Sequence, residues 1–160
     1  MTGNAGSGKS TLSRQLAAGL DLPWFGLDQI VWQERWRKTP EVERDSRIAD
    51  LIAQESWVVD GVSDQVLRAA DAVVFLDVPR YRCYGRAARR NVRYLFSSRP
   101  ELPDHCPEIL IIPRLVKIIW RFPRHVRPRI LAGRAEYGQD RTFIHVRSQI
   151  EPGQILARLR

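Results

Sequence analysis

The stretch from residue 3 to residue 10 reads G-N-A-G-S-G-K-S and matches every fixed position of the pattern G-x-x-x-x-G-K-[ST]. Glycines in this pattern let backbone N–H groups turn inward around phosphate oxygens, the lysine reaches the β and γ phosphates, and the next hydroxyl ligates Mg²⁺. We expect nucleotide contacts from Gly3, Asn4, Ala5, Gly6, Ser7, Gly8, Lys9, Ser10 and Thr11. The stretch therefore predicts a site for ATP and Mg²⁺, with Lys9 as a catalytic cation and Ser10 as a metal ligand.

Only Met1 and Thr2 precede this loop, although such a loop normally follows a buried β-strand. We expect the first, central strand to be missing, the sheet to have a poorly filled slot, and the natural product to begin upstream with several aliphatic residues. Burying about five apolar residues of such a strand contributes roughly 8 to 15 kcal/mol. An ordinary domain has a total stability of about 5 to 15 kcal/mol, so we expect the chain as given to be marginally stable.

The composition is that of a soluble globular protein, with 44% hydrophobic and 28% charged residues among 160. This length predicts a single domain over residues 1–160. No apolar run approaches the roughly 18 to 20 residues that cross a bilayer, and the N-terminus lacks the order of a signal peptide. We therefore expect a cytoplasmic protein that does not contact a membrane, with both cysteines reduced.

The net charge of +8 is carried almost wholly by arginine, since only three of the 26 basic residues are lysine. More than half of the arginines lie between residues 80 and 134, where acids are few. Arginine binds phosphate with two parallel hydrogen bonds, so this segment suits either nucleic acid or a small phosphorylated ligand. It is either a lid or groove that binds anions or a solvated basic surface.

Helical and strand patterns alternate along the chain. Apolar spacing, capping residues and proline positions predict helices over residues 9–20, 41–54, 63–70, 80–97, 109–120, 124–136 and 152–160. Short apolar or β-rich runs predict strands over residues 23–28, 57–59, 72–76 and 142–146. The alternation indicates an α/β fold with a parallel sheet, whose ligands collect at the carboxyl ends of the strands.

Two acids follow predicted strands and are candidates for the carboxylate on the magnesium side of the site. Asp60 follows W-V-V, and Asp77 follows A-V-V-F-L. We favour Asp60, because Gly61 lets the chain turn away at once and leaves the carboxylate open. Asp77 precedes Val78-Pro79, a context more typical of a turn residue.

Asp28 ends the predicted second strand at the same edge of the sheet, where it is placed to hold or deprotonate an acceptor hydroxyl. The alternative is an N-cap for the segment that follows. Trp32 and Trp36 come next, one helical turn apart, either as core residues or as walls of an acceptor pocket.

Arginines recur on the predicted helix over residues 80–97 at spacings that place several of them on one side. The arginines are Arg86, Arg89, Arg90 and Arg93. Directed toward the phosphate loop, they would neutralise charge in a transition state and close over the nucleotide. Directed away from it, they form a solvated surface.

The chain resembles the adenylate-kinase-related proteins often labelled DNA topology modulation proteins. The resemblance rests on GNAGSGKST, LDQIVWQERW, WVVDG, ADAVVFLDVPR, RPELPDHCPE and FPRHVRPRIL and covers nearly the whole chain. It implies a P-loop NTPase fold, with a parallel sheet of order 2-3-1-4-5 covered by helices on both faces, ATP with Mg²⁺, and a basic lid. It also implies an acceptor-side role for Asp28, a role after the third strand for Asp60, and lid roles for Arg86, Arg90 and Arg99.

Two functional hypotheses follow. The first is a P-loop kinase that transfers a phosphoryl group from ATP to a small-molecule acceptor, with Asp28, Asp60 and the arginines completing the site. The second is a nucleotide-regulated DNA-binding protein that affects DNA topology through its basic surface. Neither the acceptor nor the oligomeric state follows from the sequence.

Overall fold

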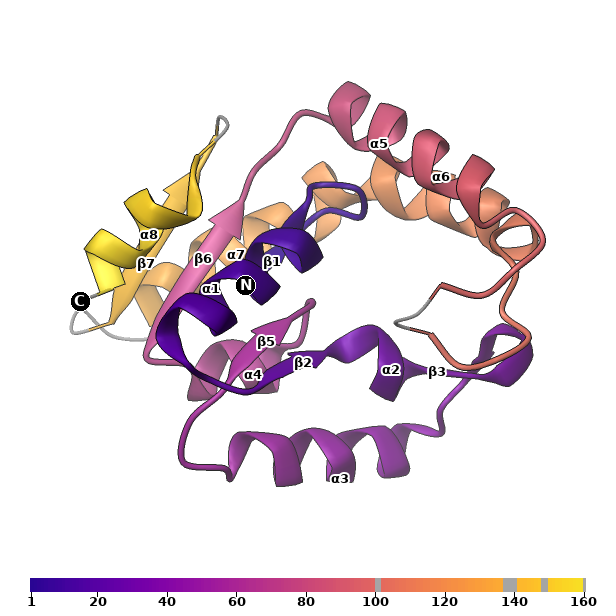
Figure 1. Cartoon of the computed structure of the whole chain (residues 1–160). Coiled ribbons are helices and arrows are strands. Elements are labelled where there is room, and N and C mark those ends of the chain that lie inside the picture. The colour runs from indigo at the N-terminus through magenta and orange to yellow at the C-terminus, as the bar shows by residue number, and fades with distance from the viewer. Residues whose placement is uncertain (100–101, 137–140, 148–149, 160) are drawn as a thin grey trace.

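The computed structural model describes residues 1–99, 102–136, 141–147 and 150–159 (Figure 1). The elements in chain order are β1 (Thr2–Gly3), α1 (Lys9–Leu20), β2 (Trp24–Gly26), α2 (Leu27–Val31), β3 (Trp32–Gln33), η1 (Glu34–Trp36), β4 (Arg37–Lys38), α3 (Glu41–Ile52), β5 (Val58–Asp60), α4 (Asp64–Ala69), β6 (Ala72–Leu76), α5 (Arg80–Arg93), α6 (Glu108–His125), α7 (Arg127–Glu136), β7 (Thr142–Val146) and α8 (Pro152–Leu159). In the described part of the chain, no helix is both long and apolar enough to cross a membrane.

The main strands pair in parallel, which confirms the α/β class. Strand β6 lies between β1 and β7, and β2 pairs with β5. The short strands β3 and β4 form a separate antiparallel hairpin. The boundaries predicted for α1, β6 and β7 are those observed, because glycines, apolar runs and β-branched residues define these elements locally.

The start of the chain corrects the expectation that no strand precedes the phosphate loop. Thr2 and Gly3 pair in parallel with Phe75 and Leu76 of β6. On the other side, the Met1 nitrogen donates to the Val59 carbonyl over 2.7 Å, and the Gly61 nitrogen donates to the Met1 carbonyl over 3.1 Å. A two-residue strand therefore exists, because backbone groups hydrogen-bond whatever the side chains are.

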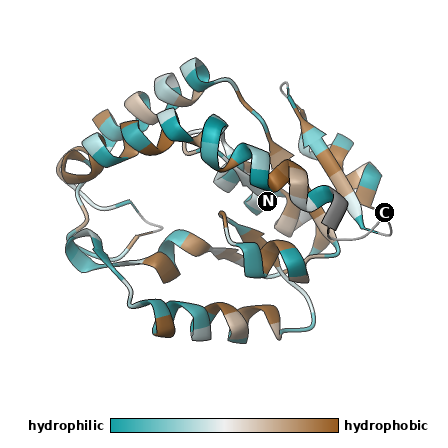
Figure 2. Cartoon of the chain, turned by 180° about the vertical axis from the view of Figure 1, so that it is seen from behind, coloured by the Kyte–Doolittle hydropathy of each residue, from teal (hydrophilic) through white to brown (hydrophobic). Residues whose placement is uncertain are grey.

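Helices cover both faces of the β6–β7 pair. On one face, Val74 and Leu76 of β6 pack with apolar residues of α1, β7 and α8. On the other, Val73 and Phe75 pack with residues of α4, α6 and α7. An unbroken apolar run suits β6 because successive side chains point to opposite, equally buried faces. The covering helices carry both hydrophilic and hydrophobic residues (Figure 2).

A further apolar cluster joins β5 to the helices next to it. It contains Leu27 of α2, Ile48 and Leu51 of α3, Val59 of β5 and Val66 of α4. Helix α3 buries Ile48 and Leu51, whereas Val42 in its first turn is exposed, and the Ser63 hydroxyl accepts from the Val66 nitrogen as the N-cap of α4. This cluster holds β5 in place, and β5 ends in Asp60.

Helix α6 differs from the prediction. It runs unbroken from Glu108 to His125 and includes Pro113 and Pro123, although a break at Phe122-Pro123 was expected. The boundary with α7 lies at Val126 instead. Four apolar residues of α6 are buried at helical spacing, namely Ile111, Leu115, Ile119 and Phe122. Leu115 and Ile119 pack with α5, Phe122 packs with β6, and Ile111 packs with the segment before α6. This burial outweighs the hydrogen bonds that the prolines remove.

Candidate functional site

The phosphate-loop motif forms a tight turn between β1 and α1. Gly6 and Gly8 have φ values of 75° and 94°, a backbone conformation that residues with a side chain rarely adopt. Gly8 is also the N-cap of α1. The Ser7 nitrogen donates to the Asn4 carbonyl over 3.1 Å, and the Asn4 side chain donates to the Ile119 carbonyl over 3.1 Å. The hydrogen bond from Asn4 therefore fastens the turn to α6. The N-terminus of α1, which carries a partial positive charge, faces the opposite side of the turn.

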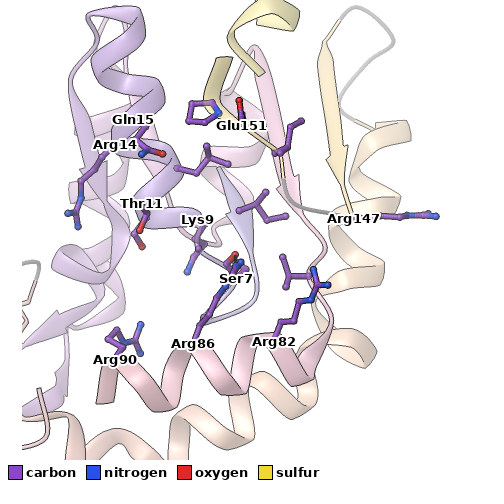
Figure 3. Close-up of a pocket in the computed structure, with 18 of the residues that line it drawn as sticks. Ser7, Lys9, Thr11, Arg14, Gln15, Arg82, Arg86, Arg90, Arg147 and Glu151 are labelled. Carbon is purple, nitrogen blue, oxygen red and sulfur yellow. Dashed lines mark hydrogen bonds between the residues drawn. The ribbon is translucent and has the colours of Figure 1, made fainter. Parts of the chain in front are cut away.

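A cavity of about 920 Å³ opens over this turn (Figure 3). Its basic lining residues are Lys9, Arg14, Arg82, Arg86, Arg90, Arg99 and Arg147, and its acidic lining residue in the described chain is Glu151. Of the predicted nucleotide contacts, residues 6–11 line this cavity, while Gly3, Asn4 and Ala5 lie beneath it. A concave site with such a surplus of cations attracts and holds a polyanion.

Three arginines of α5 lie along one side of the helix and line the cavity. Arg82, Arg86 and Arg90 recur every fourth residue and project from α5 toward the phosphate loop (Figure 3). Arg86 Nη1 donates to the Ser7 carbonyl over 2.6 Å. Arg89 and Arg93, which the sequence placed in the same group, are not among the lining residues.

The structure separates the two acids that follow strands. The Asp60 carboxylate is almost fully buried and lies 4.0 Å from Lys9 Nζ, and its Oδ1 atom has no hydrogen-bond partner in the described chain. Asp77 instead accepts from Arg127 Nε at 2.9 Å and contacts His145 Nε2 at 2.9 Å. Only Asp60 is therefore placed beside the lysine of the loop.

The ion pairs of Asp77 change its acidity. Burial alone raises the pKa of Asp77, but the hydrogen bonds from Arg127 and His145 outweigh burial, so its pKa lies below the ordinary value. The carboxylate joins the end of β6 to α7 and β7. Asp77 thus has a structural role as an ion-pair partner, which differs from the turn role that its sequence context favoured.

The structure corrects two predictions for Asp28, its position at the end of a strand and the alternative of an N-cap. Strand β2 ends at Gly26, and Asp28 lies in the first turn of the short helix α2 rather than at the end of the strand. It is not an N-cap, because Gly26 holds that position and makes no side-chain capping bond. The Asp28 carboxylate is 57% exposed and its Oδ2 lies 3.8 Å from Arg99 Nη2, so Asp28 faces a residue of the cavity without itself lining it.

Glu108 is an ionisable residue near the cavity that sequence reasoning did not single out. It has no exposed surface, and its Oε1 lies 2.5 Å from Arg99 Nε. Its Oε2 lies 3.6 Å from Arg90 Nη2. In the sequence, Glu108 is noted only as part of the segment RPELPDHCPE that carries the family resemblance. No local pattern predicts which basic residues pair with it.

The two tryptophans belong to the β3–β4 hairpin, where Trp32 lies in β3 and Trp36 ends the short 3₁₀ turn η1. Trp32 in β3 and Trp36 at the turn pack edge to face, with ring centroids 5.5 Å apart. Trp36 Nε1 donates to the Pro107 carbonyl over 2.8 Å, and Trp32 packs against Leu102 and Cys106. They fasten the hairpin to the segment before α6, and neither lines the cavity.

No protein-family model matches the chain, and no curated protein matches it. Among solved structures, it is similar to shikimate kinase from Acinetobacter baumannii in complex with shikimate, with a TM-score of 0.53, 18% identity, and coverage of 99% of this chain and 87% of that one. Shikimate kinase from Bacteroides thetaiotaomicron has a TM-score of 0.49, 20% identity and coverage of 99% and 90%. Shikimate kinase from Aquifex aeolicus has a TM-score of 0.48, 16% identity and coverage of 99% and 92%.

The first of these likenesses, at 18% identity, shows the fold alone. The chain has an α/β fold like that of shikimate kinase, and the motif at residues 3–10 lies between a strand and a helix, the structural context that this motif requires.

Proposed function

We propose that this protein transfers the γ-phosphoryl group of ATP to a small-molecule acceptor. The observation that carries the proposal is the convergence of Lys9 and three α5 arginines on one cavity above a phosphate-binding turn, in a chain with a kinase fold. Phosphoryl transfer requires mainly positioning and neutralisation of charge on the phosphate oxygens. The residues of this cavity supply both.

The nucleotide residues have distinct roles in this proposal. Backbone N–H groups of the turn hold the phosphates, and Lys9 reaches the β and γ phosphates. Thr11, which also lines the cavity, makes a further contact with the nucleotide. Arg86 and Arg90 stabilise the charge of the transferred group, and Arg99 closes the same side of the cavity.

The donor set of the site fits Mg²⁺. Ser10 contributes a hydroxyl at the cavity surface, and Asp60 contributes a buried carboxylate whose Oδ1 has no hydrogen-bond partner in the described chain. Hard oxygen donors of this kind, with water and phosphate oxygens, are what Mg²⁺ prefers. When bound, the ion would neutralise charge on the phosphates.

The acceptor side is assigned to Asp28. Its carboxylate is exposed and lies next to Arg99, so it is accessible to a hydroxyl brought up to the cavity. There it would hold the hydroxyl and accept its proton as phosphoryl transfer proceeds. The class of acceptor is a small molecule with a hydroxyl or phosphate group.

The finer family relation is part of the proposal. We place the chain among adenylate-kinase-related P-loop kinases with strand order 2-3-1-4-5. Counting only the parallel strands in chain order, this order corresponds to β2-β5-β1-β6-β7. The pairings of β2 with β5 and of β6 with β1 and β7 support this order, as do the hydrogen bonds from Met1 to Val59 and Gly61. They are consistent with β1 lying between β5 and β6.

The placement of the arginines favours a kinase over a DNA-binding protein. Arg82, Arg86, Arg90 and Arg99 all come from the basic segment, and all line one concave cavity. A duplex needs its cations spread over a surface that follows the phosphate backbone. A salt series of binding titrations with duplex DNA tests the alternative, which requires affinity that falls steeply with salt.

The decisive experiment measures ATP consumption with Mg²⁺ across nucleoside monophosphates and small hydroxylated metabolites. Lys9→Ala is expected to lower any turnover by roughly 10²-fold or more, because it removes a cation from the developing charge. Lys117→Ala is the matched control, since Lys117 is exposed on α6 and does not line the cavity. Equal turnover in the Lys9→Ala variant and the wild type would refute the site assignment.

A further inference from the structure

Glu108 is an ionisable residue that is fully buried, at a position where an apolar side chain would be expected. It lies in the first turn of α6 with an exposed fraction of 0%. An ionised carboxylate in such a place is strongly unfavourable unless cations and hydrogen bonds compensate it. The identity of its partners therefore indicates why a carboxylate occupies this position.

Its partners come from α5 and from the loop that follows α5. Arg99 Nε is 2.5 Å from Oε1, in an ion pair whose angle lies outside hydrogen-bond geometry, and Arg90 Nη2 is 3.6 Å from Oε2. In the amide orientation that satisfies both of its polar atoms, Asn91 donates to Oε2 over 2.6 Å and to the Ala87 carbonyl over 3.1 Å. One carboxylate thus holds two guanidinium groups, one from α5 and one from the loop after it.

Both of these guanidinium groups line the cavity, whereas Glu108 does not. Two guanidinium groups close together repel each other, so a buried anion between them lowers the cost of concentrating positive charge on one side of the cavity. Arg99 also reaches Asp28, with 3.8 Å between Nη2 and Oδ2. The ion pairs therefore run from the proposed acceptor side, through Arg99 and Glu108, to Arg90.

The backbone keeps this arrangement in register. The Glu108 nitrogen donates to the Tyr94 carbonyl and the Ile109 nitrogen to the Leu95 carbonyl, each over 3.1 Å. These bonds tie the start of α6 to the two residues that directly follow α5. The carboxylate is thereby set at a fixed distance from the helix that carries Arg90.

We propose that Glu108 is a positioning residue that holds Arg90 and Arg99 toward the phosphates of the bound nucleotide. This inference rests on the proposed function, because it assigns the two arginines to the phosphoryl group. Glu108 acts through them and does not itself contact the substrate. Its removal lowers nucleotide affinity and turnover only while the arginines are present.

The first experiment compares Glu108→Gln with the wild type in calorimetric binding of a non-hydrolysable ATP analogue with Mg²⁺. We expect the Kd to rise about tenfold, the size of coupling found within one ion-pair network. Asp104→Asn is the control, because Asp104 is exposed on the loop before α6 and does not line the nucleotide cavity. An unchanged Kd in a folded Glu108→Gln protein would overturn the proposal.

A double-mutant cycle separates positioning from general stability. In a protein that already carries Arg90→Ala and Arg99→Ala, Glu108→Gln is expected to cause no further loss of affinity, whereas a full additional tenfold loss contradicts the positioning role. If Glu108→Gln does not fold, Glu108→Asp enters the same cycle, since it keeps the charge and shortens its reach. Absence of nucleotide binding by the wild type overturns the proposed function and this inference together, while additive losses overturn only the inference.

Discussion

The substitution Gly6→Ala tests the link between the phosphate loop and α5. Gly6 has a φ of 75°, and a Cβ atom placed there overlaps the Cys83 carbonyl oxygen and comes within 3.1 Å of the carbonyl carbon and 3.2 Å of Cα. All three atoms belong to the backbone of α5, which is fixed by its helical hydrogen bonds and by the burial of the Cys83 side chain. The loop and the helix must therefore move apart to accept alanine.

Two costs determine the magnitude. A left-handed conformation costs a residue with a side chain roughly 1 to 2 kcal/mol, and overpacking a tight contact costs roughly 1 to 3 kcal/mol. The free energy of unfolding is therefore expected to fall by about 2 to 5 kcal/mol. For a domain of this size each 1 kcal/mol lowers the Tm by about 2 to 4 °C, which corresponds to a fall of roughly 4 to 20 °C.

Gly85→Ala is the matched control, because it makes the same chemical change in α5, two residues from Cys83. A Cβ atom at Gly85 meets no atom within 4 Å. Alanine is a better helix former than glycine by about 0.5 to 1 kcal/mol, so this variant is expected to gain roughly 1 to 4 °C. Thermal unfolding followed by circular dichroism measures both variants, and ATP-analogue binding is expected to weaken only in Gly6→Ala. A shift of the Tm in the same direction by both substitutions would refute the predicted overlap between Gly6 and α5.

Two further predictions concern stability. The pKa of Asp77 is lower in the folded protein than its ordinary value of about 3.9, so its pairing with Arg127 and His145 stabilises the fold above about pH 4 and is lost as the pH falls through the folded pKa. Urea unfolding between pH 3 and pH 6 is expected to show this decline in the wild type and a shallower one in Asp77→Asn; equal slopes would contradict it. Ser63→Ala removes the hydroxyl that accepts from the Val66 nitrogen at 3.4 Å and is expected to cost about 0.5 to 1 kcal/mol in the same assay, whereas Ser63→Asn should retain most of that stability.

Local patterns were sufficient for the elements that begin and end at chemically distinctive residues. The glycines before Lys9 predicted the start of α1, and the apolar run from Ala72 to Leu76 predicted β6. The hairpin containing Trp32 and Trp36 was not predicted. Its turn has positive φ values at Arg35 and Trp36, and arginine and tryptophan are not residue types that indicate such a turn. Its stability comes from tertiary packing against the segment before α6.

The continuation of α6 through Pro123 also shows a local signal that tertiary packing overrides. Proline is a local signal for a helix end, and the sequence correctly shows that a hydrogen bond is lost there. Whether the helix ends there depends on how much apolar surface the helix buries. Ile119 and Phe122 are buried against other elements, so the helix continues to His125.

The sequence by itself determined the glycine-rich turn before α1, the alternation of helices and strands, and the surplus of arginine, because these depend on backbone conformation, hydrophobic period and composition within short windows. Only the tertiary structure decided that Asp60 lies beside Lys9 while Asp77 is held by Arg127, and that Glu108 joins Arg90 to Arg99. These are electrostatic pairings between residues from different elements. Their geometry depends on how the helices pack around the sheet, and no local pattern encodes it.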